Sequence, residues 1–333
     1  MSKRISFLAV LMCVVMIGTA GVAQKKILHM YTALDVNEAK IYIETFEKSH
    51  PDISVKWVRL SAGEVLARIR AEGSYPTASI WLGGSSPSHI AAAKDGLLEP
   101  YFSRYSWALP LNFKDPEARW VGIYTGFIGF ASNTDFLKKY GIEAPTSWQD
   151  LLKSVFRKEI AMAYAYTSGT AYTTLATIIQ LMGEEKGFEY VAKFNEQIHH
   201  YTRAGSACVT EVGLGEVAVG LAFSHDIVKK GIAKGYPVTM SFPKEGTGYE
   251  IGAMSLIKGG PEPELAKVFY DWLLTPACQN LYKKWFRVPL APGAITGEGV
   301  VTADKVNLIK FDSVWAGENR DRLTDKWREV TKQ

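Results

Sequence analysis

Several residue patterns that mark enzymes are missing from this sequence. It contains no Gly-x-Ser-x-Gly elbow, no His-Glu-x-x-His pair and no Gly-x-x-x-x-Gly-Lys-Ser/Thr loop. Its 6 histidines are spaced in a way that suggests no catalytic triad. We therefore expect a binding protein without a cofactor rather than an enzyme.

Cysteine and excess charge are also scarce. The chain has 3 cysteines in 333 residues, too few for a disulfide framework, and we expect Cys208 and Cys278 to be free, buried thiols. The formal net charge is only +4, from 38 basic and 34 acidic residues. This balance gives no sign of nucleic-acid binding.

Long hydrophobic runs are confined to the N-terminus. Lys3 and Arg4 precede an apolar run over 5–17, and small residues follow at 19–23. This order is typical of a secretory signal peptide, and the run is shorter than the roughly 20 apolar residues of a membrane span. We predict a signal peptide at 1–23 and a periplasmic mature chain. Cys13 follows Met12 rather than a small residue, so lipoprotein anchoring is not expected.

The remaining chain alternates between strand and helix patterns. Its length of about 310 residues exceeds the usual size of one hydrophobic core, which predicts two lobes. In the first part, apolar stretches predict strands at 27–31, 53–57 and 78–82, with helices at 36–46 and 63–72 between them, and at 53–57 the apolar residues occupy every second position. Strands that alternate with helices predict a mainly parallel α/β sheet.

Two later stretches are predicted to cross between the lobes. The segment 120–131 is β-rich with three spaced glycines, and the segment 243–257 returns the chain. We therefore assign 24–125 and 250–333 to lobe 1, with the aromatic-rich tail packed there, and 126–249 to lobe 2. Lobe 2 is expected to contain a helix at 147–155 and strands at 159–164 and 217–222.

Several stretches together resemble one known family. They are Ser168-Gly169-Thr170-Ala171-Tyr172, residues 215–226, residues 245–253 and the tail 315–320. The sequence is similar to bacterial periplasmic solute-binding proteins that bind ferric ion, phosphorylated sugars, phosphonates or thiamine. The resemblance spans essentially the whole mature chain and implies a type II two-lobed fold with hinge strands.

The resemblance also implies a function and partners. A small-molecule ligand would bind in the interlobe cleft, and the closed form would dock on the membrane permease of an ABC importer. The ligand would bias the closure by touching both lobes. A ligand sensor that contacts a signalling receptor is an alternative. A monomer is expected, because a closing cleft needs no second subunit.

Hydroxyl-rich turns precede several predicted helices. A helix N-terminus presents unpaired N–H groups and a partial positive charge, so such turns suit a phosphate or another oxyanion. The same residues also serve as ordinary N-caps, which is the competing interpretation. The candidate ligand contacts in these turns are Thr32, Ser85, Ser86, Ser168, Gly169, Thr170 and Ser206.

Three further polar residues are candidates for binding sugar hydroxyls. Carboxylates accept hydrogen bonds from hydroxyls, and imidazole can donate or accept. His225 and Asp226 follow a predicted strand, and Glu250 lies at the return crossing. Asp226 could instead cap a helix and Glu250 could be structural. Together, the turns and these residues favour a phosphorylated sugar or an organophosphonate.

Two other ligands stay open. Ferric iron requires anionic oxygen ligands, and the family's iron binders typically use adjacent tyrosines. The mature chain has no Tyr-Tyr pair, but Tyr164, Tyr166 and Tyr172 surround one turn and could form a different iron site. A thiamine-type ligand would need aromatic faces, which Trp81, Tyr124 and Tyr172 could offer.

Overall fold

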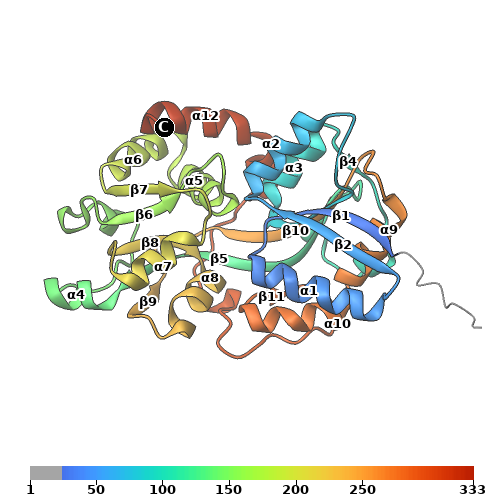
Figure 1. Ribbon diagram of the computed structural model, residues 1–333. Helices are drawn as coiled ribbons and strands as arrows, with labels where there is room; N and C mark the ends of the chain where they lie inside the picture. The colour runs from blue at the N-terminus through green and yellow to red at the C-terminus, as the bar shows by residue number, and fades with distance from the viewer. Residues whose placement is uncertain (1–24) are drawn as a thin grey trace, which may run out of the picture.

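The computed structural model describes residues 25–333. The predicted signal peptide at 1–23, and Cys13 with it, lies outside the described residues. The fold is a mixed α/β architecture in which two groups of strands, each flanked by helices, lie at opposite ends of the molecule (Figure 1). The strand order is β2 (Ile53–Arg59), β1 (Lys26–Thr32), β3 (Ile80–Ser85), β10 (Tyr249–Ile257), β5 (Val121–Asn133), β8 (Val219–Phe223), β6 (Ile160–Ala163) and β7 (Ile198–Thr202). The predicted α/β fold class is therefore confirmed.

The first lobe begins with three parallel strands and the helices between them. Strands β1 and β2 run in register from Lys26↔Ile53 to Thr32↔Arg59, and β3 pairs on the other side of β1. Helix α1 buries Ala39, Tyr42, Ile43 and Phe46 because they repeat at helical spacing. The elements are β1 (Lys26–Thr32), α1 (Val36–Ser49), β2 (Ile53–Arg59), α2 (Ala62–Glu72), β3 (Ile80–Ser85), α3 (Ser86–Lys94) and β4 (Leu98–Glu99).

Strand β5 (Val121–Asn133) joins the two groups of strands. Its first half pairs with β10 (Tyr249–Ile257) and with β11 (Val288–Pro289). Its second half pairs with β8 (Val219–Phe223) and β9 (Val238–Ser241). All of β5 is buried. The predicted crossing at 120–131 is confirmed, and the strand predicted near 251–257 is β10.

The second lobe repeats the α/β pattern. Strand β6 pairs in parallel with both β7 and β8. The expected helix at 147–155 is wrong: the segment forms two 3-10 turns, Gln149–Leu152 and Ser154–Phe156, because the extended backbone of Lys153 separates them. The other elements are α4 (Thr134–Tyr140), β6 (Ile160–Ala163), α5 (Gly169–Met182), α6 (Glu184–Asn195), β7 (Ile198–Thr202), α7 (Ala207–Leu214) and α8 (Ser224–Lys230).

The C-terminal region divides its packing between the two lobes. Helices α9 (Pro263–Leu273) and α10 (Pro276–Gln279) belong to the hydrophobic core that contains α1. Helix α11 (Ser313–Glu318) packs on α3, whereas α12 (Arg320–Thr331) lies beside α6 (Figure 1). Leu323 and Trp327 are buried in the second-lobe core, with the Trp327 ring 5.1 Å from that of Tyr201. The expectation that the whole tail packs on lobe 1 is therefore wrong for α12.

The cores explain why the cysteines stay separate. Cys208 lies in a cluster with β8 and α7, and Cys278 lies in the core of the first lobe. Both are free and buried, as predicted. Across residues 25–333, no helix is long and apolar enough to cross a membrane.

Candidate functional site: the interlobe cavity

A small polar cavity lies where strand ends and helix N-termini of both lobes converge. Its volume is about 50 Å³ in this conformation, which is room for little more than a water molecule. A sugar-sized ligand therefore requires the lobes or the lining side chains to move apart. The cavity is lined by Ala33, Asp35, Arg59, Ser61, Ala62, Gly84, Ser85, Tyr124, Ser168, Gly169, Thr170, Gly205, Ser206, Phe223, His225, Asp226, Glu250 and Arg287.

Helix N-termini form one wall of the cavity. Ser85 is the N-cap of α3, Ser168 of α5 and Ser206 of α7. The Ser168 hydroxyl accepts a hydrogen bond from the Ala171 amide at 3.3 Å, so it does act as a cap. The first N–H groups of a helix have no intrahelical acceptor, and in α5 these belong to Gly169 and Thr170. This wall is suited to an anion.

Arg59 adds a positive charge beside this wall. It is the last residue of β2, so the parallel sheet carries its side chain to the same edge as the end of β3. Its guanidinium donates to the Ser61 hydroxyl at 3.3 Å and to the Leu34 carbonyl at 3.4 Å. Both acceptors are neutral, and the nearby carboxylate of Asp35 interacts with Arg59 only through its charge, so the guanidinium can also pair with an anionic ligand.

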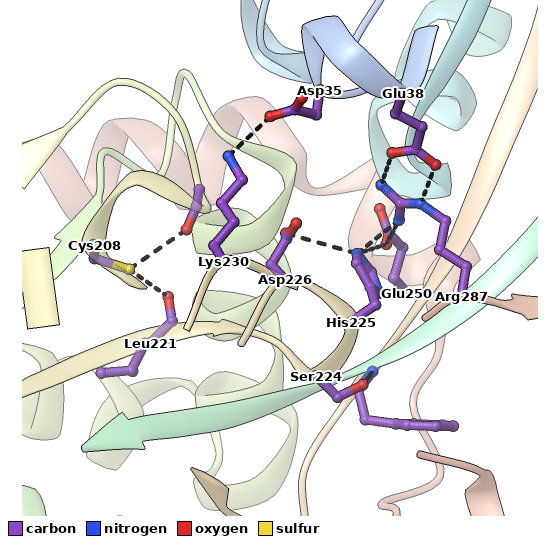
Figure 2. A network of polar contacts seen from close by, with 12 residues as sticks. Asp35, Glu38, Cys208, Leu221, Ser224, His225, Asp226, Lys230, Glu250 and Arg287 are labelled. Carbon is purple, nitrogen blue, oxygen red and sulfur yellow. Dashed lines mark hydrogen bonds and ion pairs between the residues drawn. The ribbon is translucent and has the colours of Figure 1, made fainter. Parts of the chain in front are cut away.

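Another part of the cavity lining is a buried network centred on Arg287 (Figure 2). Its Nε and Nη2 donate to the two carboxylate oxygens of Glu38 at 2.7 and 2.9 Å. Its Nη1 lies 2.6 Å from Nε2 of His225 in α8, so the contact joins the two lobes. Since arginine only donates, Nε2 of His225 must accept and the imidazole is neutral. Burial, and then the charge of Arg287, lower the pKa of His225 well below its usual value.

Two further acids border this network. Glu250 lies 3.7 Å from Nη1 of Arg287, and Asp226 lies 3.6 Å from Nε2 of His225. Burial raises the pKa of Glu250 to about 8, although the positive charge of Arg287 acts in the opposite direction. Burial also raises the pKa of Asp226. Within residues 25–333, Oε2 of Glu250 has no hydrogen-bond partner. A polar ligand group that entered the cavity would supply such a partner.

The raised pKa of Glu250 predicts a specific pH dependence of stability. Below the unfolded-state pKa of 4.5, Glu250 is protonated in the folded and the unfolded state, and its contribution to the free energy of unfolding is fully present. As the pH rises toward about 8, the unfolded state loses its proton first, so the free energy of unfolding should fall. The Glu250→Gln variant lacks this titration. Urea denaturation from pH 5 to 8 should show a difference between wild type and variant that changes steadily with pH; a constant difference would contradict the raised pKa.

The structure brings together most of the residues predicted from the sequence. Two candidates do not line the cavity: the Thr32 hydroxyl accepts from the Leu34 amide at 3.2 Å, and Ser86 is buried within α3. The residues around the cavity are Ser85, Ser168, Gly169, Thr170, Ser206, His225, Asp226 and Glu250.

The three tyrosines of the iron alternative lie elsewhere. The Tyr172 hydroxyl donates to the Ala316 carbonyl, and Tyr164 and Tyr166 pack with Trp327. None of the three lines the cavity. Within residues 25–333, no group of three or more His, Cys, Asp or Glu side chains is arranged to hold a metal ion.

Sequence reasoning missed the two arginines of the cavity. Arg59 ends a strand in which polar residues alternate with apolar ones, as they do in many strands with one exposed face. Arg287 precedes a strand of only two residues, which is too short to be predicted from a sequence pattern. One available signal was the position of Arg59 at the carboxyl end of a predicted parallel strand, where ligands bind in such sheets. No local pattern pointed to Arg287, because its partner Glu38 is 249 residues away.

Contacts near the cavity show that the two lobes meet in this conformation. Lys230 of α8 pairs with Asp35 at 3.0 Å, and Arg203 pairs with Glu64 of α2 at 2.9 Å. The Ser61 hydroxyl donates to the Arg203 carbonyl at 3.2 Å. Each contact joins a residue of the first lobe, before β5 in the chain, to a residue of the second lobe, after β5. The structure therefore represents a closed arrangement of the lobes.

Comparison with known proteins identifies the family to which the chain belongs. The family of bacterial extracellular solute-binding proteins matches residues 76–312, which is more than half of the chain. The chain belongs to this family. The solute-binding protein is also similar in structure to AfuA of Actinobacillus pleuropneumoniae, whose structure has exogenous fructose-6-phosphate bound. The TM-score is 0.87 and the identity 34%, over 92% of this chain and 98% of that chain.

Two sequence relatives extend the comparison. A protein of Haemophilus influenzae without an assigned function is 33% identical over 291 residues, covering 84% of each chain. A Salmonella typhimurium protein, provisionally named as 2-aminoethylphosphonate-binding and periplasmic, is 24% identical over 257 residues, covering 72% of this chain and 70% of the relative. The solute-binding protein is thus of the periplasmic ABC-importer type, which implies a small-molecule ligand and a cognate permease.

Proposed function

We propose that this solute-binding protein captures a small ligand with a phosphoryl or phosphonyl group and delivers it to its permease without a catalytic step. The observation that carries the proposal is the mixed lining of the cavity. Helix N-termini and Arg59 supply groups suited to an anion, and the same cavity is also lined by acids beside the Arg287 network. A ligand with an anionic end and a hydroxylated end matches this lining.

The anionic end would be bound at the N-termini of α5 and α7. Thr170 and Ser206 supply hydroxyls there, and the first N–H groups of α5 point out of the helix toward an acceptor. Hydrogen bonds from such groups to a charged oxyanion are shorter and stronger than neutral ones. Arg59 would supply the compensating charge.

The hydroxylated end would be bound by Asp226 and Glu250. A sugar hydroxyl can donate to one carboxyl oxygen while it accepts from a protonated acid, and Glu250 holds its proton to about pH 8. The bound fructose-6-phosphate named for AfuA and the phosphonate named for the Salmonella relative support this ligand class.

Calorimetry with a small panel tests the proposed ligand class. Fructose 6-phosphate or 2-aminoethylphosphonate should bind the mature protein, whereas fructose without phosphate should bind at least tenfold more weakly. Inorganic phosphate should bind with intermediate affinity, because it fills only the anion-binding wall. Binding of fructose that equals binding of its phosphate ester would contradict the anion site.

An Asp226→Asn variant separates the two halves of the site. We expect it to weaken the binding of fructose 6-phosphate by at least tenfold, because the amide replaces one acceptor oxygen by a donor. The affinity for inorganic phosphate should stay within about twofold of the wild-type value. A Glu216→Gln variant, which changes an exposed acid outside the cavity, is the matched control. An equal loss of both ligands in Asp226→Asn would argue against its role in binding hydroxyls.

The mature form and its assembly are also part of the proposal. We propose that export removes residues 1–23, that no lipid is attached, and that the mature chain acts as a monomer. Lobe 1 consists of residues 24–125 and 250–333 without α12, and lobe 2 consists of residues 126–249 together with α12. The intact mass of the periplasmic protein and its light-scattering mass should both correspond to one chain that starts at residue 24. A lipid-modified mass or a stable dimer would contradict these statements.

A further inference from the structure

The N-terminus of α2 makes a close contact with the other lobe outside the cavity. The Gly63 amide donates to the Thr167 carbonyl at 2.8 Å. Gly63 is the second residue of α2, where an amide has no acceptor within its own helix. Thr167 lies in the turn between β6 and α5, in the second lobe. The closed arrangement therefore satisfies an N–H group that α2 itself cannot satisfy.

The space at Gly63 admits no side chain. A Cβ atom there would lie 2.0 Å from the Tyr166 carbonyl oxygen, 2.9 Å from that of Thr167 and 2.6 Å from Nη2 of Arg320. Two of these neighbours are backbone atoms, which cannot rotate away. Arg320 is 4% exposed, donates to the Tyr166 carbonyl at 3.1 Å and lies over the Tyr172 ring at 5.0 Å, so it is also held in place.

The backbone of α2 gives no reason for a glycine at this position. Gly63 does not have a positive φ, and alanine favours a helix more than glycine does. Gly63 does not line the cavity either, although its neighbour Ala62 does. All the clashing groups belong to the second lobe or to α12, which packs on it.

We infer that Gly63 is a positioning residue for ligand capture, because its lack of a side chain lets the Tyr166–Thr167 turn dock on α2 and complete closure. The inference rests on the proposed function only in assuming that closure captures the ligand. Gly169 plays a comparable part at the cavity, where a Cβ would lie 2.3 Å from the Ser85 hydroxyl. Gly63 acts without touching the ligand.

A cross-linking experiment tests Gly63 independently of the ligand. Glu64 and Arg203 pair between the two lobes, so cysteines at both positions should be joined by a short bis-maleimide when the lobes close. The native Cys208 and Cys278 are buried and free, which keeps them from competing. Glu64→Cys/Arg203→Cys should cross-link slowly without ligand, and Gly63→Ala in the same background should reduce the rate at least tenfold.

An Ala67→Gly variant is the matched control, because it changes helix propensity at an exposed position of α2. It should leave the cross-linking rate unchanged. Gly63→Ala alone should keep the urea midpoint at or above that of wild type and bind fructose 6-phosphate at least tenfold more weakly.

The outcomes separate the two ideas. Equal cross-linking rates in the parent cysteine pair and in the same pair with Gly63→Ala, or a parent pair that never cross-links, would overturn the role of Gly63. Fructose 6-phosphate that fails to speed cross-linking in the parent pair would count only against the proposed ligand, because the comparison of rates without ligand still decides the role of Gly63.

Discussion

Replacing Arg287 by methionine is expected to lower the free energy of unfolding by about 3–5 kcal/mol, the usual cost of removing one partner from a buried ion pair. The Arg287 and Glu38 side chains are 6% and 1% exposed, and their contact is bidentate. Without Arg287, the hydroxyl of Tyr42 is the only hydrogen-bond partner left to the buried Glu38 carboxylate within residues 25–333. Chemical denaturation of wild type and variant measures the difference.

The double variant Glu38→Met/Arg287→Met separates pairing from packing. Since removal of both charges leaves no unpaired ion, it should recover much of the stability lost in Arg287→Met. Arg203→Ala, which breaks a solvent-exposed ion pair, should stay close to wild type. A double variant as unstable as the single one would show that Arg287 contributes mainly through its packing on the Tyr124 ring, 3.9 Å away.

Replacing Thr170 by valine is expected to weaken binding of fructose 6-phosphate by about 1.5–3 kcal/mol, the range for one hydrogen bond to a charged group. This corresponds to roughly 10- to 150-fold in the dissociation constant. Thr170 lines the cavity at the second helical position of α5, and valine keeps its shape. Fructose without phosphate should lose far less affinity, because it lacks the anion that the hydroxyl would bind.

Thr173→Val in the same helix is the control. The Thr173 hydroxyl is buried away from the cavity and has no hydrogen-bond partner within residues 25–333, so its removal should leave the affinity unchanged. Calorimetry of both variants measures the contrast. Equal affinities in wild type, Thr170→Val and Thr173→Val would leave the N-terminus of α5 as an ordinary helix cap.

Local patterns were sufficient to predict much of the fold. The strands β1, β2, β6, β8 and β10 lie close to where apolar stretches of the sequence predicted strands, and β5 was recognisable from its β-rich composition and its glycines. The packing of the C-terminal tail was harder to predict, because Leu323 and Trp327 form an apolar face that could pack on either lobe. Only the tertiary structure shows that they meet Tyr201 and the second-lobe core.

The candidate site also contains some residues that local sequence patterns predict and others that only the tertiary structure reveals. Its hydroxyl turns carry local signals, since Ser168, Gly169 and Thr170 stand where a strand gives way to a helix. Arg287 carries none, because its role depends on contacts with Glu38 and His225, which lie far away in the chain. The role proposed for Gly63 depends on a turn more than a hundred residues away that meets α2 only when the lobes close.

Native mass spectrometry of the protein as purified from the periplasm, and after addition of fructose 6-phosphate, 2-aminoethylphosphonate or Fe(III), is the most direct test of the proposed function. We expect one added mass per chain that matches a phosphorylated or phosphonate compound, and its loss in Thr170→Val under the same conditions. Iron bound without such a compound, or no binding of either anionic ligand, would contradict the proposal that the cavity captures an oxyanion.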